Sequence, residues 1–376
     1  MKRGSVRNRL LDYYFGIPIL FAMAALKRTR RCPEEPRRIG IMGSPGLGDT
    51  LLHSAVLPDL RSRYPFAQII YFAPSTGYAA ARLLPCVDDI VRVDMTRPIN
   101  TIHMIRKWKF DIFIDLIPWP RLAAFYTAMS GAKCTVGFRS RGQYRDWNYD
   151  IRAEHSPECH ELENLRNILR ALHITPHAEL SINFPPSSGS RNAETRHIVF
   201  HPWASGDLAE LREWTEVRWV ELARQLDTSA TSFTITGGPA NVNQCSALQT
   251  KLIRAGLRAE ILCGGTGLEN VIRRLQTTDL VVTVNTGIMH LAAITGVPTV
   301  ALNGPVAAHR YGPIGPRSVS VEPRLGGGGF LHFGFEYEGN PTDSMIRISV
   351  EDVMASIAIV APDLVNKHAS QPIASV

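Results

Sequence analysis

Asp49 stands in a short segment with two glycines, residues 44–50 (SPGLGDT), between a β-branched stretch and a helical pattern. Gly46 and Gly48 allow the backbone to turn tightly and approach a ligand. The first turn of a helix favours an ionised carboxylate, and such an Asp can take a proton from a hydroxyl. The pattern therefore indicates either a general base or a plain helix N-cap, where Asp is common.

A second candidate follows the apolar stretch 280–284 and opens a helix. Backbone N–H groups at Thr286 and Gly287 would form an anion site suited to a phosphate, with Asn285 beside it. His290 lies one helical turn further on. The alternative for His290 is a histidine that only packs the helix.

A third group begins at His201, which ends another β-branched stretch. Arg212 lies just before a helical pattern, where a cation suits a diphosphate. The alternative is a solvated arginine beside a core tryptophan, Trp214. Thr236 and Gly237 end the next strand, and we expect them on the donor side with His201.

A fourth group is a basic loop containing Arg139, Arg141 and Arg145. It could hold an acidic acceptor, or it could be an exposed basic loop without a function. The nearby histidines, cysteine and glutamate in residues 155–161 match no zinc spacing, and no Asp-x-Asp occurs in the chain. We therefore expect no metal site.

Alternating strand and helix patterns position these groups. Such alternation predicts an α/β fold with doubly wound parallel sheets covered on both faces. The predicted strands are residues 39–42, 68–73, 90–93, 110–116 and 135–138 in the first half, and 197–201, 232–236, 259–263, 280–284, 299–302 and 318–321 in the second.

Two arrays of this kind predict two Rossmann-like domains that face each other across a cleft, with ligands at the carboxyl ends of the strands. The predicted parts are an N-terminal arm (1–37), a first Rossmann-like domain (38–183), a Pro/Ser/Gly-rich linker (184–196), a second Rossmann-like domain (197–350) and a C-terminal helix and tail (351–376).

The charge is concentrated in the arm. The chain of 376 residues has a net charge of +7, and residues 1–38 hold ten basic and three acidic residues. The rest of the chain is balanced, so the charge does not indicate nucleic-acid binding. Residues 13–26 are uncharged, too short to span a bilayer comfortably, and flanked by cations. This pattern predicts an in-plane membrane anchor, or alternatively an extra helix packed on the domain.

Six scattered cysteines form no Cys-x-x-Cys pair. This distribution disfavours a disulfide scaffold and fits a reducing, cytoplasmic compartment.

Taken together, these segments resemble glycosyltransferase family 9, the ADP-heptose:lipopolysaccharide heptosyltransferase family, over roughly residues 38–360. The resemblance is carried by "IGIMGSPGLGDTLLHSAVLPDLRSRYP", "HPWASGDLAELREWTEVRWVELARQL" and, most specifically, "TDLVVTVNTGIMHLAAITGVPTVALNGP". "CHELENLRNILRALHI" resembles the family's histidine-led helix near the end of the acceptor domain, which puts His160 on the acceptor side.

The resemblance implies a GT-B fold and an inverting, metal-independent transfer, with an acceptor-binding first domain (38–183) and a nucleotide-sugar-binding second domain (197–350). It puts Gly46 and Gly48 on the acceptor side, and it implies a location on the inner face of the bacterial inner membrane. Asp49 matches the family's proposed base, Arg212 a cation that meets the donor diphosphate, and Thr286, Gly287 and His290 the phosphate-binding signature. The family usually has Asp where this chain has Asn285, which keeps a hydrogen-bonding side chain and loses the charge. The implied donor is a nucleoside diphosphate sugar, with an ADP-sugar favoured and no cofactor. The implied acceptor is a lipid-linked or oligosaccharide acceptor such as lipopolysaccharide core.

Three other functions are open at this stage. A sugar-nucleotide 2-epimerase would have the same fold and need no acceptor. A non-catalytic nucleotide-sugar-binding protein would not need Asp49. A nicotinamide dehydrogenase is disfavoured, because the G-x-G-x-x-G fingerprint and its acidic ribose-binding residue are absent.

Overall fold

The computed structural model describes residues 6–186, 194–206, 208–333, 336–337 and 343–365. These residues divide into two compact units, Met1–Phe184 and Pro185–Val376, each of which is treated by itself. Most of the predicted linker, at 187–193, and the tail from 366 onward lie outside the described residues.

Unit 1 is built on a six-stranded parallel sheet with the order β3-β2-β1-β4-β5-β6. Its strands are β1 (Arg38–Met42), β2 (Gln68–Pro74), β3 (Asp89–Val93), β4 (Ile112–Asp115), β5 (Cys134–Ser140) and β6 (Ile151–His155). Its helices are α1 (Val6–Ala25), α2 (Leu47–Leu52), α3 (Leu57–Arg63), α4 (Tyr78–Ala81), α5 (Pro98–Arg106), α6 (Arg121–Met129) and α7 (Glu161–Ala171).

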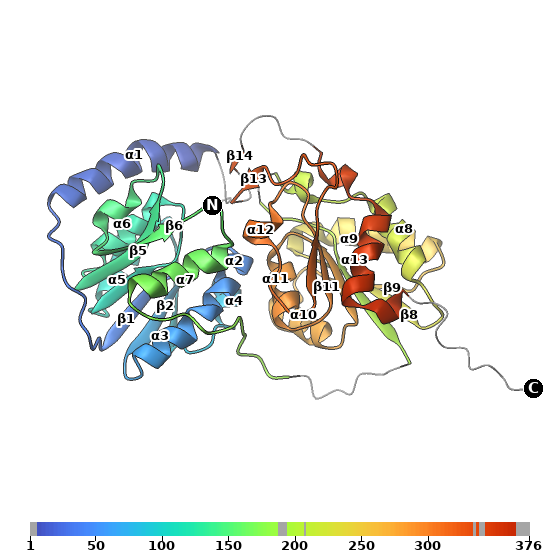
Figure 1. Ribbon diagram of the computed structural model, residues 1–376, viewed down its shortest axis with the longest axis horizontal. Coiled ribbons are helices and arrows are strands. Elements are labelled where there is room, and N and C mark those ends of the chain that lie inside the picture. Colours follow the sequence, from blue (N-terminus) through green and yellow to red (C-terminus); the bar gives the residue numbers. More distant parts are fainter. Residues whose placement is uncertain (1–5, 187–193, 207, 334–335, 338–342, 366–376) are drawn as a thin grey trace, which may run out of the picture. The chain divides into compact units, whose positions relative to one another are not determined.

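Helices cover both faces of this sheet (Figure 1). On one face, Leu60 of α3 and Ile168 of α7 pack against β-strand residues such as Ile41. On the other face, Ile105 of α5 and Tyr126 of α6 join a second buried cluster. A sheet buried on both sides needs nearly continuous apolar strands, which is why the β-branched runs were readable in the sequence.

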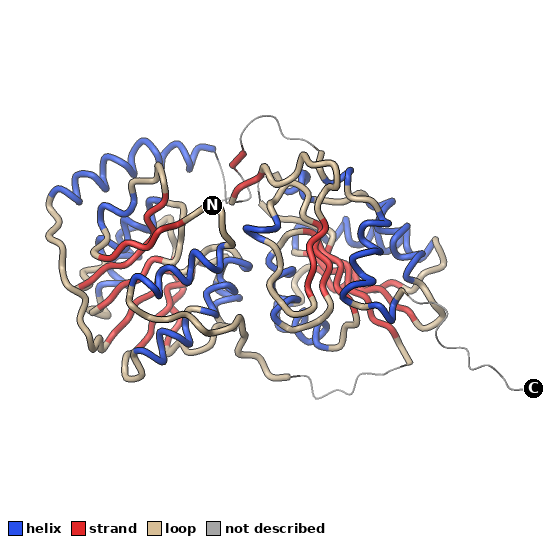
Figure 2. The backbone as a smooth tube through the Cα atoms, viewed as in Figure 1, coloured by secondary structure: helices blue, strands red, loops and turns tan. Residues whose placement is uncertain are grey.

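Unit 2 repeats the same strand order in its own sheet, β12-β11-β10-β7-β8-β9 (Figure 2). Its strands are β7 (Arg196–His201), β8 (Thr231–Gly237), β9 (Ala259–Cys263), β10 (Leu280–Val284), β11 (Thr299–Leu302) and β12 (Ser318–Val321), with a short hairpin of β13 (Leu331–His332) and β14 (Glu336–Tyr337). Its helices are α8 (Glu216–Leu226), α9 (Val242–Arg254), α10 (Gly267–Gln276), α11 (Gly287–Ile294), α12 (Ala308–Tyr311) and α13 (Val350–Val360).

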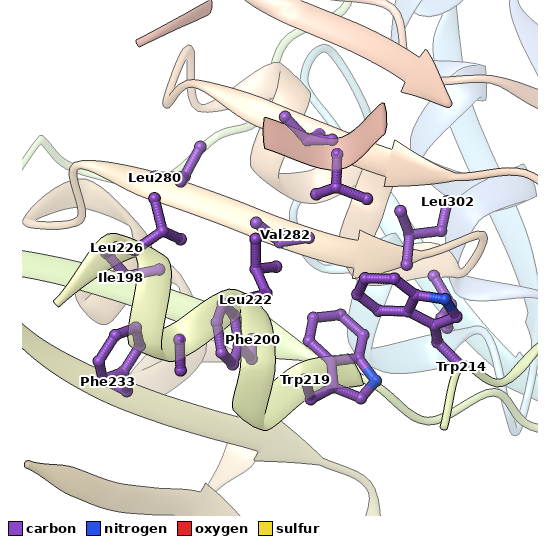
Figure 3. Close-up of a cluster of buried hydrophobic side chains, with 14 of the residues drawn as sticks. Ile198, Phe200, Trp214, Trp219, Leu222, Leu226, Phe233, Leu280, Val282 and Leu302 are labelled. Carbon is purple, nitrogen blue, oxygen red and sulfur yellow. The ribbon is translucent and has the colours of Figure 1, made fainter. Parts of the chain in front are cut away.

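An aromatic cluster fills one face of the unit 2 sheet (Figure 3). Trp219 of α8 is fully buried, with its ring 4.9 Å from that of Phe200 and 5.4 Å from that of Trp214. Val353 and Ile357 of α13 belong to the same cluster. Burial of these large rings contributes much of the stabilisation of the unit, and the C-terminal helix is part of its core.

The predicted α/β fold of two doubly wound sheets is confirmed. Each predicted strand is present with its ends shifted by at most one or two residues. The structure adds the short hairpin of β13 and β14 and an edge strand, β6, which pairs with β5; in β6 Ala153 is buried, while Arg152 and Glu154 are exposed.

Helix α1 packs on unit 1 over α6 (Figure 1). Its inward face places Asp12 3.0 Å from Arg121, a nearly buried pair, and Leu20 in a small apolar cluster with Ala124 and Tyr149. The side-chain nitrogen of Asn148 donates to the carbonyl oxygen of Leu20. Within the described residues, no helix combines the length and apolar character needed to cross a bilayer.

A disulfide joins Cys32 to Cys134, whose Cα atoms lie 5.0 Å apart. It fastens the segment after α1 to the first residue of β5. Scattered cysteines without a Cys-x-x-Cys pair predicted no disulfide scaffold, and this single bond joins two cysteines that are 102 residues apart.

We predict that Asp12→Ala destabilises unit 1 by about 2–3 kcal/mol, because Arg121 would remain buried without its charged partner. The carbonyl oxygens of Gln143 and Gly142 would still accept hydrogen bonds from Arg121, which limits the loss. Urea unfolding measures the change, with Glu35→Ala at an exposed acidic residue of the same region as the control. Equal stability of the two variants would show that the Asp12–Arg121 pair does not hold α1.

Candidate active site

Asp49 lies in the first turn of α2, directly beyond the carboxyl end of β1. Gly46 is the N-cap residue and has an extended backbone, and Gly48 follows inside the helix. Neither glycine has a positive φ, so backbone freedom is not what these positions require. The side chain of Asp49 is half-buried, and its negative charge acts on the groups beneath the loop.

The loop rests on a buried polar layer that the sequence analysis missed. His53 Nδ1 lies 2.7 Å from the hydroxyl of Tyr71, and His53 Nε2 lies 3.5 Å from Oγ of Ser44. Burial lowers the pKa of His53 to about 4, although the nearby charge of Asp49 opposes the shift. His53 is therefore neutral at physiological pH and does not compete with Asp49 as a charged group.

Two other glycines set the close contacts of this loop. A Cβ on Gly43 would stand 2.1 Å from the ring of Tyr71, and one on Gly77 would stand 2.4 Å from the carbonyl oxygen of Ser44. Any side chain at either position would push the backbone out of place.

The three arginines of the basic loop have different surroundings. Arg139 is exposed and pairs with Glu154 at 3.3 Å, and Arg141 is exposed. Arg145 is fully buried, and its Nη2 lies 2.5 Å from Oδ2 of Asp115 at the end of β4. Acceptor binding by the three arginines remains a prediction, and the structure places only two of them at the surface.

Asp115 is the centre of the buried group around Arg145. It accepts hydrogen bonds from Arg145, from the hydroxyl of Tyr149 at 2.6 Å and from the backbone N–H of Ile117 at 2.9 Å. Burial raises the pKa of Asp115, and these three donors oppose the rise. Arg145 therefore ties the basic loop to β4.

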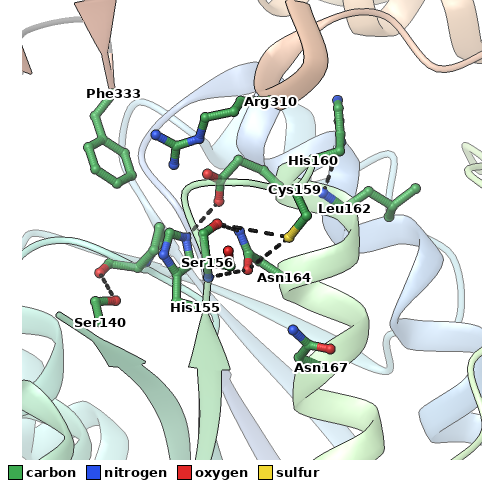
Figure 4. A network of polar contacts seen from close by, with 12 residues as sticks. Ser140, His155, Ser156, Cys159, His160, Leu162, Asn164, Asn167, Arg310 and Phe333 are labelled. Carbon is green, nitrogen blue, oxygen red and sulfur yellow. Dashed lines mark hydrogen bonds and ion pairs between the residues drawn. The ribbon is translucent and has the colours of Figure 1, made fainter. Parts of the chain in front are cut away.

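His160 opens α7 within a compact polar network (Figure 4). Its Nδ1 accepts a hydrogen bond from the backbone N–H of Leu162 at 3.0 Å, so the side chain caps the helix. His155 Nε2 lies 2.8 Å from Glu161, and Asn164 bonds both the N–H and the carbonyl of Ser156. These bonds fix the start of α7 against the end of β6.

The histidines, cysteine and glutamate of residues 155–161 are used in this network. Across the part of the chain that the structure describes, no three His, Cys, Asp or Glu side chains gather as a metal-ligand set.

In unit 2, His201 and Thr236 come together at the ends of β7 and β8. His201 Nδ1 lies 2.8 Å from Oγ1 of Thr236, whose hydroxyl donates to the carbonyl oxygen of Phe200. Burial lowers the pKa of His201 to about 4, so this histidine is neutral and acts as a hydrogen-bonding group. Gly237 follows, where a Cβ would stand 2.8 Å from Sγ of Cys245.

Arg212 ends a short 3-10 turn, Ala209–Arg212, after β7. Its Nη2 donates to the carbonyl oxygen of Ser205 at 2.5 Å, which fixes the guanidinium near the loop. The neighbouring Glu213 accepts a hydrogen bond from the backbone N–H of Ala204, and burial raises the pKa of its carboxyl group. Trp214, the alternative core residue, is indeed buried.

Thr286 is the N-cap residue of α11, which starts at Gly287 directly beyond β10. The Oγ1 of Thr286 is buried and has no hydrogen-bond partner among the described atoms. No side chain caps this helix, and the first N–H groups of a helix have no partner within it. His290 is buried one turn further on.

Asn285 is held by a network that requires an amide. Its side-chain nitrogen donates to Oδ1 of Asn303 at 2.6 Å and to the carbonyl oxygen of Tyr311 at 2.9 Å. The side-chain nitrogen of Asn303 in turn donates to Ser320 at 2.8 Å. Because a backbone carbonyl can only accept, these bonds fix which end of the Asn285 amide is the donor. With the Asn303 amide oriented as it is here, an ionised Asp could make neither bond.

The candidate residues therefore lie at equivalent places in the two units. The strand order reverses between β1 and β4 in unit 1, and between β7 and β10 in unit 2. The loops that carry Asp49, Arg212 and Thr286 follow strands next to these reversals. In open α/β sheets, ligands bind beyond the carboxyl ends of the strands at such a reversal.

Solved structures share this architecture. The Escherichia coli ADP-heptose LPS heptosyltransferase II is similar with a TM-score of 0.70 and 19% identity, covering 87% of this chain and 99% of that one. The E. coli heptosyltransferase WaaC with ADP is similar with a TM-score of 0.67 and 18% identity, and the match covers 85% of this chain and 98% of that one. The fold is thus the GT-B fold of two Rossmann-like domains.

The sequence itself defines the family. Residues 99–325 match glycosyltransferase family 9 (heptosyltransferase), so the chain belongs to that family. It is also similar to lipopolysaccharide heptosyltransferase 2 of E. coli, at 24% identity over 71% of this chain and 83% of that protein. The lipooligosaccharide heptosyltransferase 2 of Campylobacter jejuni is 21% identical over 71% of this chain and 81% of that protein.

We predict that Asn285→Asp lowers the free energy of unfolding by about 2–4 kcal/mol at neutral pH, because a carboxylate would face two acceptor oxygens. Those surroundings would raise the pKa of the new carboxyl group, so the deficit shrinks as the pH falls towards 5.

Urea unfolding at pH 7.5 and pH 5 measures both effects. Asn285→Ala removes the same donors without adding a charge and serves as the control. The amide network would be refuted by an Asp variant that is as stable as the Ala variant at pH 7.5.

Proposed function

We propose that the protein transfers a heptose or related sugar, with inversion and without a metal, from a nucleoside diphosphate sugar to a lipopolysaccharide-core or other surface-glycan acceptor. An ADP-sugar is the favoured donor, and no further cofactor takes part. Family membership supports the transfer itself. The names of the relatives support heptose and a lipopolysaccharide-type acceptor.

The observation that carries the proposal is the position of Asp49, a half-buried carboxylate beyond the end of β1 next to a strand-order reversal. The acceptor hydroxyl attacks the anomeric carbon of the donor sugar from the face opposite the leaving group. Asp49 takes the proton of that hydroxyl as the new bond forms. The start of α2 favours a negative charge at this position, as a general base requires.

Unit 2 binds the donor in this proposal. Negative charge grows on the departing nucleoside diphosphate, and the guanidinium of Arg212 offsets it. The N–H groups at the start of α11 and the unpartnered hydroxyl of Thr286 donate to the phosphates. Asn285, Gly287, His290, His201, Thr236 and Gly237 complete the donor side.

Unit 1 binds the acceptor. Gly46 and Gly48 bring the backbone of the Asp49 loop to the acceptor, and the exposed Arg139 and Arg141 attract its anionic groups. Arg145 supports their loop through Asp115. His160 lies at the start of α7, where it caps the helix.

Two alternatives make different predictions. A sugar-nucleotide 2-epimerase would isomerise or release the nucleotide sugar without an acceptor. A non-catalytic binding protein would bind the nucleotide sugar and turn nothing over. ADP release from ADP-heptose, measured with and without a lipopolysaccharide-core acceptor, separates the three functions, and transfer requires that release depend on the acceptor.

We place the enzyme on the cytoplasmic face of the inner membrane, with α1 and its flanking cations as the membrane-associating arm. A lipid-linked acceptor would be within reach there. Packing of α1 on unit 1 is compatible with this role, because only one face of the helix is used by the domain.

We predict that Asp49→Asn lowers kcat by about 10²–10⁴-fold, the usual contribution of a general base, while the Kd of ADP changes little. Acceptor-dependent ADP release measures the rate, and calorimetric titration measures ADP binding. Asp89→Asn, at an exposed carboxylate of β3 in the same unit, is the matched control. If Asp49→Asn retains activity within a few-fold of the wild type, another group is the base.

We predict that Arg212→Ala slows transfer by about 10²–10³-fold and weakens donor binding, as loss of a preorganised charge partner does. Arg224→Ala, an exposed arginine of α8, should be neutral. The wild type should keep full activity in excess EDTA. Activity that is lost on chelation and restored by magnesium or manganese would overturn the metal-independent mechanism.

A further inference from the structure

Helix α1 has two faces of different character. Asp12 is the one charged residue between positions 10 and 26, and it points inward onto Arg121. The outward face consequently carries no charge. Exposed large apolar and aromatic residues of α1 and the residue after it are here named the outer strip: Leu10, Leu11, Tyr13, Tyr14, Phe15, Ile19, Phe21 and Leu26. Tyr13 and Phe21 stand at its margins, since the ring of Tyr13 also contacts Arg121 and that of Phe21 contacts Trp147.

The outer strip is unusually apolar for a face in contact with water. Tyr14 is 66% exposed, Phe15 62% and Leu26 87%. Soluble proteins rarely leave so many large apolar side chains contiguous on one element, and such a patch marks an interaction site. The two tyrosines add hydroxyl groups to aromatic rings, the combination that is enriched where membrane meets water.

Cations follow the strip directly. Lys27 turns back to the domain, where its Nζ lies 3.1 Å from Asp150. Arg28 and Arg31 are exposed. Arg30 donates from its guanidinium to the carbonyl oxygen of Ala132 at 3.1 Å, which places it at the start of β5.

A cationic pocket lies beside that point. It encloses about 270 Å³ and is lined by Arg106, Lys109, Phe110, Ser130, Gly131 and Lys133. The pocket has three cationic side chains, Arg106, Lys109 and Lys133. Lys133 pairs with Asp111 at 2.7 Å, so its charge is partly neutralised. The positive charge of the pocket suits a phosphate group.

The pocket is separate from the candidate active site. Lys109 and Phe110 precede β4, and Ser130 to Lys133 precede β5, so the pocket lies at the amino ends of these strands. Asp49 follows the carboxyl end of β1. Since all these strands are parallel, the two sites lie at opposite edges of one sheet.

We propose that the outer strip and the cationic pocket form one docking surface for a bilayer of anionic phospholipids. The strip lies in the headgroup region parallel to the membrane, and the pocket takes the phosphate of one lipid. The proposal rests on the membrane location proposed above and adds the residues that make the contact. Charge complementarity selects this occupant, because an apolar partner protein would leave the adjoining arginines and lysines without anions.

Co-sedimentation of the full chain with vesicles tests the proposal. The probes are phosphatidylcholine vesicles with and without 30% phosphatidylglycerol, a composition chosen at roughly the anionic content that attracts polybasic segments. The wild type should bind the phosphatidylglycerol vesicles at least about tenfold more tightly than phosphatidylcholine alone.

Two variant pairs separate the contributions. Tyr14→Ser/Phe15→Ser should weaken binding to both vesicle types by about tenfold or more. Arg106→Gln/Lys109→Gln should remove most of the preference for phosphatidylglycerol, about tenfold, and leave binding to phosphatidylcholine unchanged.

The matched controls are Phe66→Ser/Val217→Ser, at exposed apolar residues elsewhere, and Arg224→Gln/Arg254→Gln, at exposed arginines of unit 2. Both should bind as the wild type does.

Three outcomes overturn the proposal. These are a wild type that does not sediment with either vesicle, variant pairs that bind as their controls do, and a lipid-free dimer that Tyr14→Ser/Phe15→Ser converts to a monomer. The dimer would identify a second copy of this chain as the occupant of the strip.

The rate of transfer to a soluble acceptor fragment, measured without vesicles, tests the proposed function separately from the proposed docking surface. The strip and pocket variants should retain wild-type rates in that assay. A wild-type chain that binds vesicles and lacks transfer activity would contradict the proposed function and leave the docking surface standing.

Discussion

Parallel pairing of β1 with both β2 and β4 is the interaction on which unit 1 depends, and β7 plays the same part between β8 and β10 in unit 2. Parallel strands all end at one edge, so every loop that leaves a carboxyl end is delivered to the same side. In each sheet the chain runs outward in one direction from β1 or β7 and in the other direction from β4 or β10. The loops that follow these neighbouring strands therefore diverge, which leaves room for a ligand between them. Asp49 and Thr286 are where they are because of this geometry, and the buried polar layer of His53 and Tyr71 serves to hold the first of these loops in place.

Much of this fold was readable because strands buried on two faces must be apolar along their whole length. The exception, β6, shows the limit. The sequence of this edge strand, IRAEH, alternates polar with apolar residues over only five positions and contains one β-branched residue. It therefore lacks the continuous apolar run by which the other strands were predicted. The Cys32–Cys134 bond could not be predicted, because a pairing across 102 residues depends on the proximity of the two cysteines in the folded chain. Helix α1 was recognised as an apolar segment, while its docking on α6 depended on the distant Arg121.

The candidate site divides in the same way. Asp49 and the 285–290 segment were found because strand ends, glycines and helix starts are local features of the chain. Asn303 and Tyr311, which hold Asn285, lie 18 and 26 residues further on and have no pattern of their own. Their importance also explains the departure at position 285, since the surrounding acceptors call for a donor that aspartate lacks. Composition suggested three equivalent arginines in the basic loop, whereas burial gives Arg145 the distinct task of neutralising Asp115.

The contacts that hold α1 on unit 1 affect the free energy with which a membrane or another partner binds the outer strip. Many amphipathic segments are unfolded in solution and must become helical as they bind, and the entropy lost on ordering is subtracted from their affinity. Here Asp12 and Lys27 fasten the helix and the residue that follows its apolar stretch before any encounter. The strip is therefore presented as a rigid, preorganised surface whose rotation about the helix axis is already set. Helicity measured by circular dichroism should be the same in the bound and unbound states.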